Sequence, residues 1–132
     1  MIVRYLVGDD EALAAKSTAI LQAVERGETV VVCDPVQLAE VVWVLSSYYE
    51  LSNAEISAAL LAIVQADGFL MGDKARYVRA LRLFGGPVPH FGDACACAVA
   101  VEECDGRLYS FDRKLCSVEG ISRAEHLPSA GD

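Results

Sequence analysis

Hydrophobic residues in this chain fall into two kinds of stretch. Long stretches with apolar residues at helical spacing are separated by short stretches that are apolar throughout, as in strands covered on both faces. Helices alternating with such strands are typical of a three-layer α/β/α sandwich around a mostly parallel sheet. The pattern predicts helices over 10–26, 35–49, 52–67, 73–84 and 92–104, and strands over 29–33, 69–71 and 107–111.

The chain is predicted to form one domain over residues 1–132. Its length of 132 residues suits a single hydrophobic core, and a hydrophobic fraction of 54% indicates that much of the sequence is buried. Residues 128–132 are expected to form a frayed tail.

Glu40 stands out because it is the one acid in a helix that is apolar nearly all round, PVQLAEVVWVLSSYY at 35–49. We expect this helix to be well buried. Burying an unpaired carboxylate is costly, so a functional role for Glu40 is favoured over a structural one. Asp34, by contrast, is explained as the N-cap of the same helix, with Pro35 at the first helical position.

Two further acids are predicted to join Glu40 at one rim of the sheet. Asp93 begins a helix that leads into the strand 107–111, and Asp112 directly follows that strand. Helix starts and strand ends meet at the same rim of a parallel sheet, where such folds bind ligands. Clustered carboxylates repel one another unless a cation joins them, and Mg²⁺ or Mn²⁺ suits oxygen ligands. These acids therefore predict metal-assisted phosphodiester hydrolysis.

Each of these acids also has a simpler structural interpretation. Taken singly, Asp93 is an ordinary helix-start residue and Asp112 an ordinary turn residue.

The five cysteines are an odd number in irregular spacing, which favours reduced core thiols over disulfides or zinc.

Hydropathy and net charge indicate which kinds of partner the chain can bind. The longest apolar run, ACACAVAV at 94–101, is too short to span a bilayer, and the N-terminus lacks the features of a signal peptide, so we expect a cytoplasmic protein with no membrane partner. A net charge of −8 repels polyanions, so a nucleic-acid partner needs divalent cations or a local basic patch. Arg113, beside Asp112, is the best-placed phosphate contact. The basic residues of 73–84 are better explained as a solvent-exposed helix face than as residues that direct RNA phosphates toward the site.

Four segments resemble the PIN-domain ribonuclease toxins of VapC type: VRYLVGDD at 3–10, LAEVVWVL at 38–45, FGDACACA at 91–98 and LYSFDRKL at 108–115. They cover nearly the whole chain in family-like order. The resemblance implies Mg²⁺- or Mn²⁺-dependent cleavage of RNA, with Glu40, Asp93 and Asp112 as catalytic and metal-binding carboxylates. It also implies that Ser110 lies near the metal, that the chain forms a homodimer, and that a small antitoxin silences it.

The sequence departs from the family pattern at its start. The central strand and its first metal-binding Asp would precede the segment matching Ile2 to Leu6, and neither is present. We expect the missing strand, with its Asp, to be encoded upstream of Met1.

Two alternatives remain open. The first is a PIN-like module that has lost catalysis but still binds an antitoxin. The second is a receiver-like phosphoacceptor domain, in which IVRYLV forms a strand ending at Asp9 and Asp10, with Lys114 as a further resemblance.

Overall fold

The computed structural model describes residues 1–129, so the end of the expected frayed tail, residues 130–132, lies outside the described residues. Six α-helices, four short strands and one 3₁₀-helix follow one another in this part of the chain. They are α1 (Ile2–Val7), α2 (Glu11–Glu25), β1 (Val31–Val32), α3 (Pro35–Ser47), α4 (Asn53–Val64), β2 (Phe69–Leu70), α5 (Lys74–Phe84), α6 (Phe91–Glu103), β3 (Arg107–Tyr109), η1 (Arg113–Ser117) and β4 (Ser122–Ala124).

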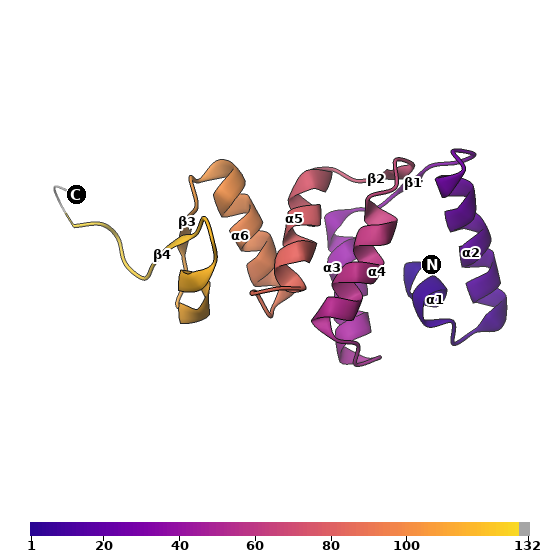
Figure 1. Ribbon diagram of the computed structural model, residues 1–132, viewed down its shortest axis with the longest axis horizontal. Helices are drawn as coiled ribbons and strands as arrows, with labels where there is room; N and C mark the ends of the chain where they lie inside the picture. Colours follow the sequence, from indigo (N-terminus) through magenta and orange to yellow (C-terminus); the bar gives the residue numbers. More distant parts are fainter. Residues whose placement is uncertain (130–132) are drawn as a thin grey trace.

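The strands pair in parallel, in two sheets. β1 pairs with β2, with Val31 opposite Phe69, and β3 pairs with β4, with Leu108 opposite Arg123. Figure 1 shows the two sheets set apart along the long axis of the molecule, with α5 and α6 drawn between them. A mixed α/β fold with parallel strands is confirmed. In the described residues, however, the strands form two separate sheets of two strands each instead of one continuous sheet.

Local sequence signals explain where the central helices begin. The Asp34 carboxylate accepts a hydrogen bond from the Val36 amide at 2.8 Å, and the Gln37 side chain accepts one from the Asp34 amide at 2.9 Å. The Ser52 hydroxyl caps α4 by accepting from the Glu55 amide at 3.2 Å. These contacts satisfy amides that have no partner within the helix. The predicted N-cap role of Asp34 is confirmed.

Three elements were not predicted: α1, η1 and β4. Residues Ile2–Val7 form a helix that ends at Gly8, whose φ of 69° is left-handed and therefore suits glycine. The receiver-like alternative requires a strand at this place, so the prediction of a strand there was wrong.

The core lies mainly between α3, α4, α5 and α6, which Figure 1 shows side by side in the middle of the molecule. Their inward-facing residues are mostly aliphatic or small and include one aromatic side chain, Phe84 of α5. Fully buried members include Leu38, Leu45, Ile56, Leu60, Leu81 and Cys97. No helix in residues 1–129 combines the length and the apolar character that crossing a membrane requires.

The expectation that α3 is buried all round was wrong. Its residues Val36 and Trp43 are each 67% exposed, although Leu38 and Leu45 on the opposite face are fully buried. Since an apolar sequence shows no polar face, periodicity could not reveal which side of this helix meets solvent.

Candidate functional site

Glu40 lies in the second turn of α3, on its exposed side. It lines a surface pocket of about 470 Å³ whose other walls are apolar, formed by Val36, Ala39, Trp43 and Val44. Within residues 1–129 its carboxylate has no hydrogen-bond or ion-pair partner. Glu40 is therefore not the buried charge that the sequence indicated: it is exposed, with apolar side chains around it.

Asp93 lies in the first turn of α6 and is half-buried. One turn further along the helix is Cys97, which is fully buried. Burial raises the pKa of the Cys97 thiol, and the nearby negative charge of Asp93 raises that pKa further. Cys97 is thus held as a neutral thiol, and Asp93 has the helix-start position that the sequence predicts.

Asp112 is the N-cap of η1. β3 ends at Tyr109, so the strand is shorter than the predicted 107–111 and Asp112 lies three residues beyond its end instead of directly after it. Its carboxylate accepts a hydrogen bond from the Lys114 amide at 3.0 Å, and its own amide donates to the Ser110 hydroxyl at 3.1 Å. Ser110 in turn is fixed to the sheet, because its amide donates to the Ala124 carbonyl at 3.0 Å. Ser110 and Asp112 therefore form one tight turn, and Arg113 follows them as an exposed residue.

The three carboxylates do not gather. A pocket of about 380 Å³ is lined by Ser46 and Ser47 at the end of α3 and by Phe91 and Gly92 at the start of α6. The start of α6 thus lies beside the end of α3, and Figure 1 shows the two helices running in opposite directions. The predicted common rim requires both helix starts to lie together, and this arrangement does not provide it.

The metal ligands predicted from sequence do not lie together in this structure. In the part of the chain that the structure describes, no three His, Cys, Asp or Glu side chains lie together in a group that could hold a metal ion. As arranged, Glu40, Asp93 and Asp112 do not fit one shared Mg²⁺ or Mn²⁺. Their predicted roles in catalysis stay predictions.

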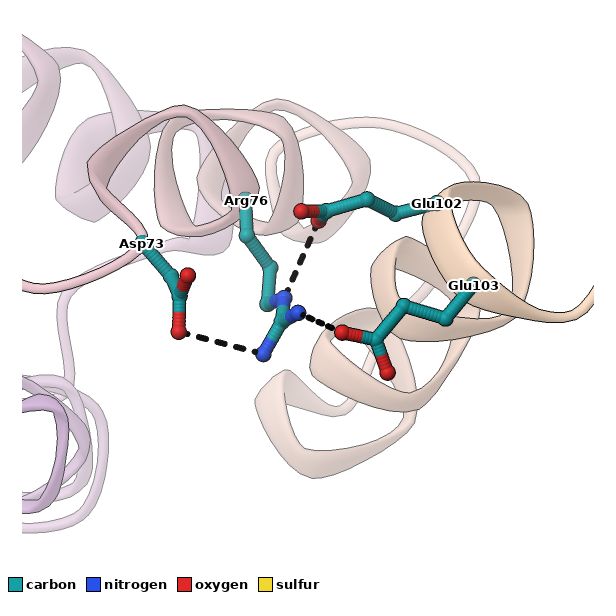
Figure 2. A network of polar contacts seen from close by, with 4 residues as sticks. All are labelled: Asp73, Arg76, Glu102 and Glu103. Atoms are coloured by element: carbon teal, nitrogen blue, oxygen red, sulfur yellow. Dashed lines mark hydrogen bonds and ion pairs between the residues drawn. The ribbon is translucent and has the colours of Figure 1, made fainter.

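Two basic residues of α5, Lys74 and Arg76, make structural contacts. Figure 2 shows Arg76 reaching from α5 to three carboxylates, with Nε donating to Glu102 at 3.0 Å and Nη2 to Glu103 at 2.6 Å. A third pair, 3.4 Å long, joins Arg76 to Asp73. These partners, Glu102 first, raise the pKa of the Arg76 guanidinium above its ordinary value. Lys74 is likewise engaged, because its ammonium donates to the Ala66 and Phe69 carbonyls. Arg76 and Lys74 therefore tie α5 to its neighbours instead of facing an RNA backbone.

A polar cluster that the sequence did not predict joins α1 to the residues after α3. Asp9 accepts a hydrogen bond from the Tyr49 hydroxyl at 2.7 Å and from the Arg4 guanidinium at 2.9 Å. The bond from Tyr49, followed by that from Arg4, lowers the pKa of the Asp9 carboxyl. Tyr49 lies 40 residues from Asp9 in sequence, so no local pattern could have indicated the contact.

Four cysteines, at 33, 95, 97 and 104, are free thiols, as predicted, but Cys104 is exposed and is not the core thiol that the sequence indicated. Burial raises the pKa of the Cys95 thiol to about 11, so this thiol stays protonated at neutral pH.

Comparisons with models of known protein families, with curated proteins and with solved structures find no match to this chain. The resemblance to PIN-domain toxins therefore rests on the four sequence segments alone.

Proposed function

We propose that the chain is a divalent-metal-dependent ribonuclease of PIN-domain type, the toxin of a toxin–antitoxin pair, with Glu40, Asp93 and Asp112 as its essential carboxylates. Ser110 and Arg113 contact the substrate. The proposal includes the complete three-layer sandwich of that family, a homodimer, a small antitoxin as partner and a cytoplasmic location.

The observation that carries this proposal is the position of Asp112. It lies three residues beyond the end of the parallel strand β3 and is held in a turn with Ser110, and strand ends are where α/β folds place reactive groups. Asp93 lies in the first turn of the helix that leads into the same strand, and Glu40 lies in the helix that leaves β1. This order of elements around the three acids supports the proposal.

A second candidate is supported by a different observation. In residues 1–129 the acids form no group that could hold a metal, while α3 presents Trp43 and Val36 on an exposed apolar face. Exposed aromatic residues beside apolar pockets are common at protein interfaces. These features favour a PIN-like module that binds an antitoxin without cleaving RNA.

RNA cleavage in Mg²⁺, in Mn²⁺ and in EDTA distinguishes the two candidates. We expect the ribonuclease to cleave only with a metal, and Glu40→Gln, Asp93→Asn and Asp112→Asn each to reduce the rate by at least about tenfold. Glu25→Gln, which changes an exposed acid at the end of α2, is the matched control and keeps the full rate. Full activity in any two of the three site variants would reject the assignment. Absence of cleavage under all conditions would favour the binding module.

A further inference from the structure

The surface pocket between α3 and the start of α6 has two aromatic walls. It is the pocket of about 380 Å³ that Ser46, Ser47 and Gly92 line, and Trp43 of α3 and Phe91 of α6 line it as well. We call it the Trp43 pocket. Its volume falls within the range of about 300 to 1,000 Å³ that is typical of small-ligand sites.

The aromatic wall on the α6 side is held in place by the core. The Phe91 ring packs edge-on against the Phe84 ring, with the centroids 5.7 Å apart and the planes at 86° to one another. Phe84 itself is buried. Trp43, on the α3 side, is 67% exposed and is therefore accessible to a ligand. Flat aromatic surfaces of this kind favour a planar ligand that stacks on them.

Polar groups in the same pocket have no partner. The hydroxyls of Ser46 and Ser47 and the imidazole of His90 line it, and within residues 1–129 none of these side chains makes a hydrogen bond or an ion pair. All three are exposed, so a ligand can bond to them without breaking an existing contact. In the described part of the chain, no Asp, Glu, Lys or Arg side chain lines this pocket. The lining therefore suits an uncharged planar group with donors and acceptors on its edge.

The Trp43 pocket lies beside two of the carboxylates proposed to be essential. Ala39 and Gly92 line it, and they directly precede Glu40 and Asp93 in the chain. Trp43 lines both this pocket and the one that contains Glu40. An occupant of the Trp43 pocket is thus a close neighbour of both acids.

We propose that the Trp43 pocket binds one unpaired base of the RNA substrate, an inference that rests on the proposed ribonuclease function. The base stacks on Trp43 and Phe91, and its edge bonds to the Ser46 and Ser47 hydroxyls and to the His90 imidazole. Proteins that bind single-stranded RNA commonly combine stacking on aromatic side chains with hydrogen bonds to base edges. A base is uncharged, so it avoids the repulsion that a net charge of −8 exerts on phosphates.

An aliphatic side chain of a protein partner matches this lining less well. It would cover the two aromatic walls, but it would also exclude water from the Ser46 and Ser47 hydroxyls and from the His90 imidazole. Polar groups that lose water without gaining a hydrogen bond oppose binding. The three polar side chains therefore favour a base as the occupant.

Trp43 is the only tryptophan of the chain, so its fluorescence and its indole N–H signal in NMR spectra report on this pocket alone. The probes are adenosine, guanosine, cytidine and uridine in EDTA, with ribose as the control that lacks a base. We expect at least one nucleoside to quench the fluorescence saturably and to shift the indole signal, and ribose to do neither. These probes require neither a metal ion nor RNA cleavage, so their binding is independent of catalysis.

A variant that fills the pocket locates the bound nucleoside. No atom lies within 4 Å of a Cβ added at Gly92, so Gly92→Leu adds bulk to the lining without a clash at the Cβ. We expect the dissociation constant of the tightest nucleoside to rise by at least about tenfold. Gly72→Leu, at an equally open glycine outside the pocket, is the matched control and keeps the parent affinity. If circular dichroism shows that Gly92→Leu does not fold, the double variant Ser46→Ala, Ser47→Ala takes its place, with the same expected loss.

Three results would overturn the proposal: no saturable response to any nucleoside, an equal response to ribose, or parent affinity in the folded pocket variant. A response to N-acetyl-leucine amide but to no nucleoside would assign the pocket to a side chain of a protein partner and contradict the proposal. Nucleoside binding by a chain that cleaves no RNA in Mg²⁺ or Mn²⁺ would support the base pocket and reject the ribonuclease. RNA cleavage without nucleoside binding would do the opposite.

Discussion

The hydroxyl of Tyr49 donates a hydrogen bond of 2.7 Å to the carboxylate of Asp9, and so joins the end of α3 to the turn between α1 and α2. This bond is the largest cause of the lowered pKa of Asp9. A lowered carboxyl pKa contributes stability above the ordinary value of 3.8, and that stability is lost as the pH falls through the folded-state pKa.

Tyr49→Phe is expected to raise the pKa of Asp9 toward its ordinary value and to make the chain less stable at neutral pH. NMR titration of the carboxyl carbon measures the pKa, and thermal melts across acidic pH measure the stability. Tyr48→Phe is the matched control, because Tyr48 is exposed and its ring stacks edge-on against Tyr49 without bonding to Asp9. Equal pKa values in the two variants would show that the bond does not form.

Arg76 is expected to hold α5 against α6 through its pairs with Glu102 and Glu103 (Figure 2). Arg76→Met keeps the aliphatic stem but loses the donors, so its melting temperature should fall. The Arg76 side chain is only 13% exposed. The Arg107 side chain, by contrast, is 78% exposed and pairs with Asp105 at 3.9 Å. Arg107→Met should therefore melt as the parent does, because exposed pairs contribute little. A similar loss in both variants would assign the effect to net charge instead.

Gly85 is expected to be intolerant of a side chain. A Cβ at this position would lie 2.6 Å from the Ser57 Cβ, and Ser57 is fixed because its hydroxyl donates to the Leu81 carbonyl at 2.7 Å. Gly85→Ala should lower the free energy of unfolding by about 1 to 3 kcal/mol, the usual cost of overpacking. Gly72→Ala, where no atom lies within 4 Å of the added Cβ, is the control. Urea unfolding of both variants measures the difference.

Five of the six α-helices in residues 1–129 could be predicted from sequence because their signals are local; α1 was not predicted. Asp34 and Ser52, for example, cap α3 and α4 through contacts that span two or three residues. Strand lengths could not be predicted in the same way. TVVVC at 29–33 has the composition of a strand throughout, but only Val31 and Val32 pair, because the length of a strand depends on the partner beside it.

For the candidate site, the sequence indicated where each residue lies within its own element but not how far apart the residues are. The positions of Asp93 at a helix start and of Asp112 after a strand followed from their neighbours in sequence. Their distance from Glu40 depends on how α3 and α6 pack, and no local pattern contains that information. The exposure of Trp43 was missed for a related reason: a helix that is apolar on every side does not indicate which side is covered.

Titration of Mn²⁺ into the chain, followed by electron paramagnetic resonance, is the sharpest test of the proposed ribonuclease, because it measures metal binding without requiring an RNA substrate. We expect saturable binding that weakens in each of Glu40→Gln, Asp93→Asn and Asp112→Asn and is unchanged in Glu25→Gln. Absence of saturable binding, or binding that all three site variants retain, would contradict the proposal that the metal dependence of a ribonuclease rests on these carboxylates.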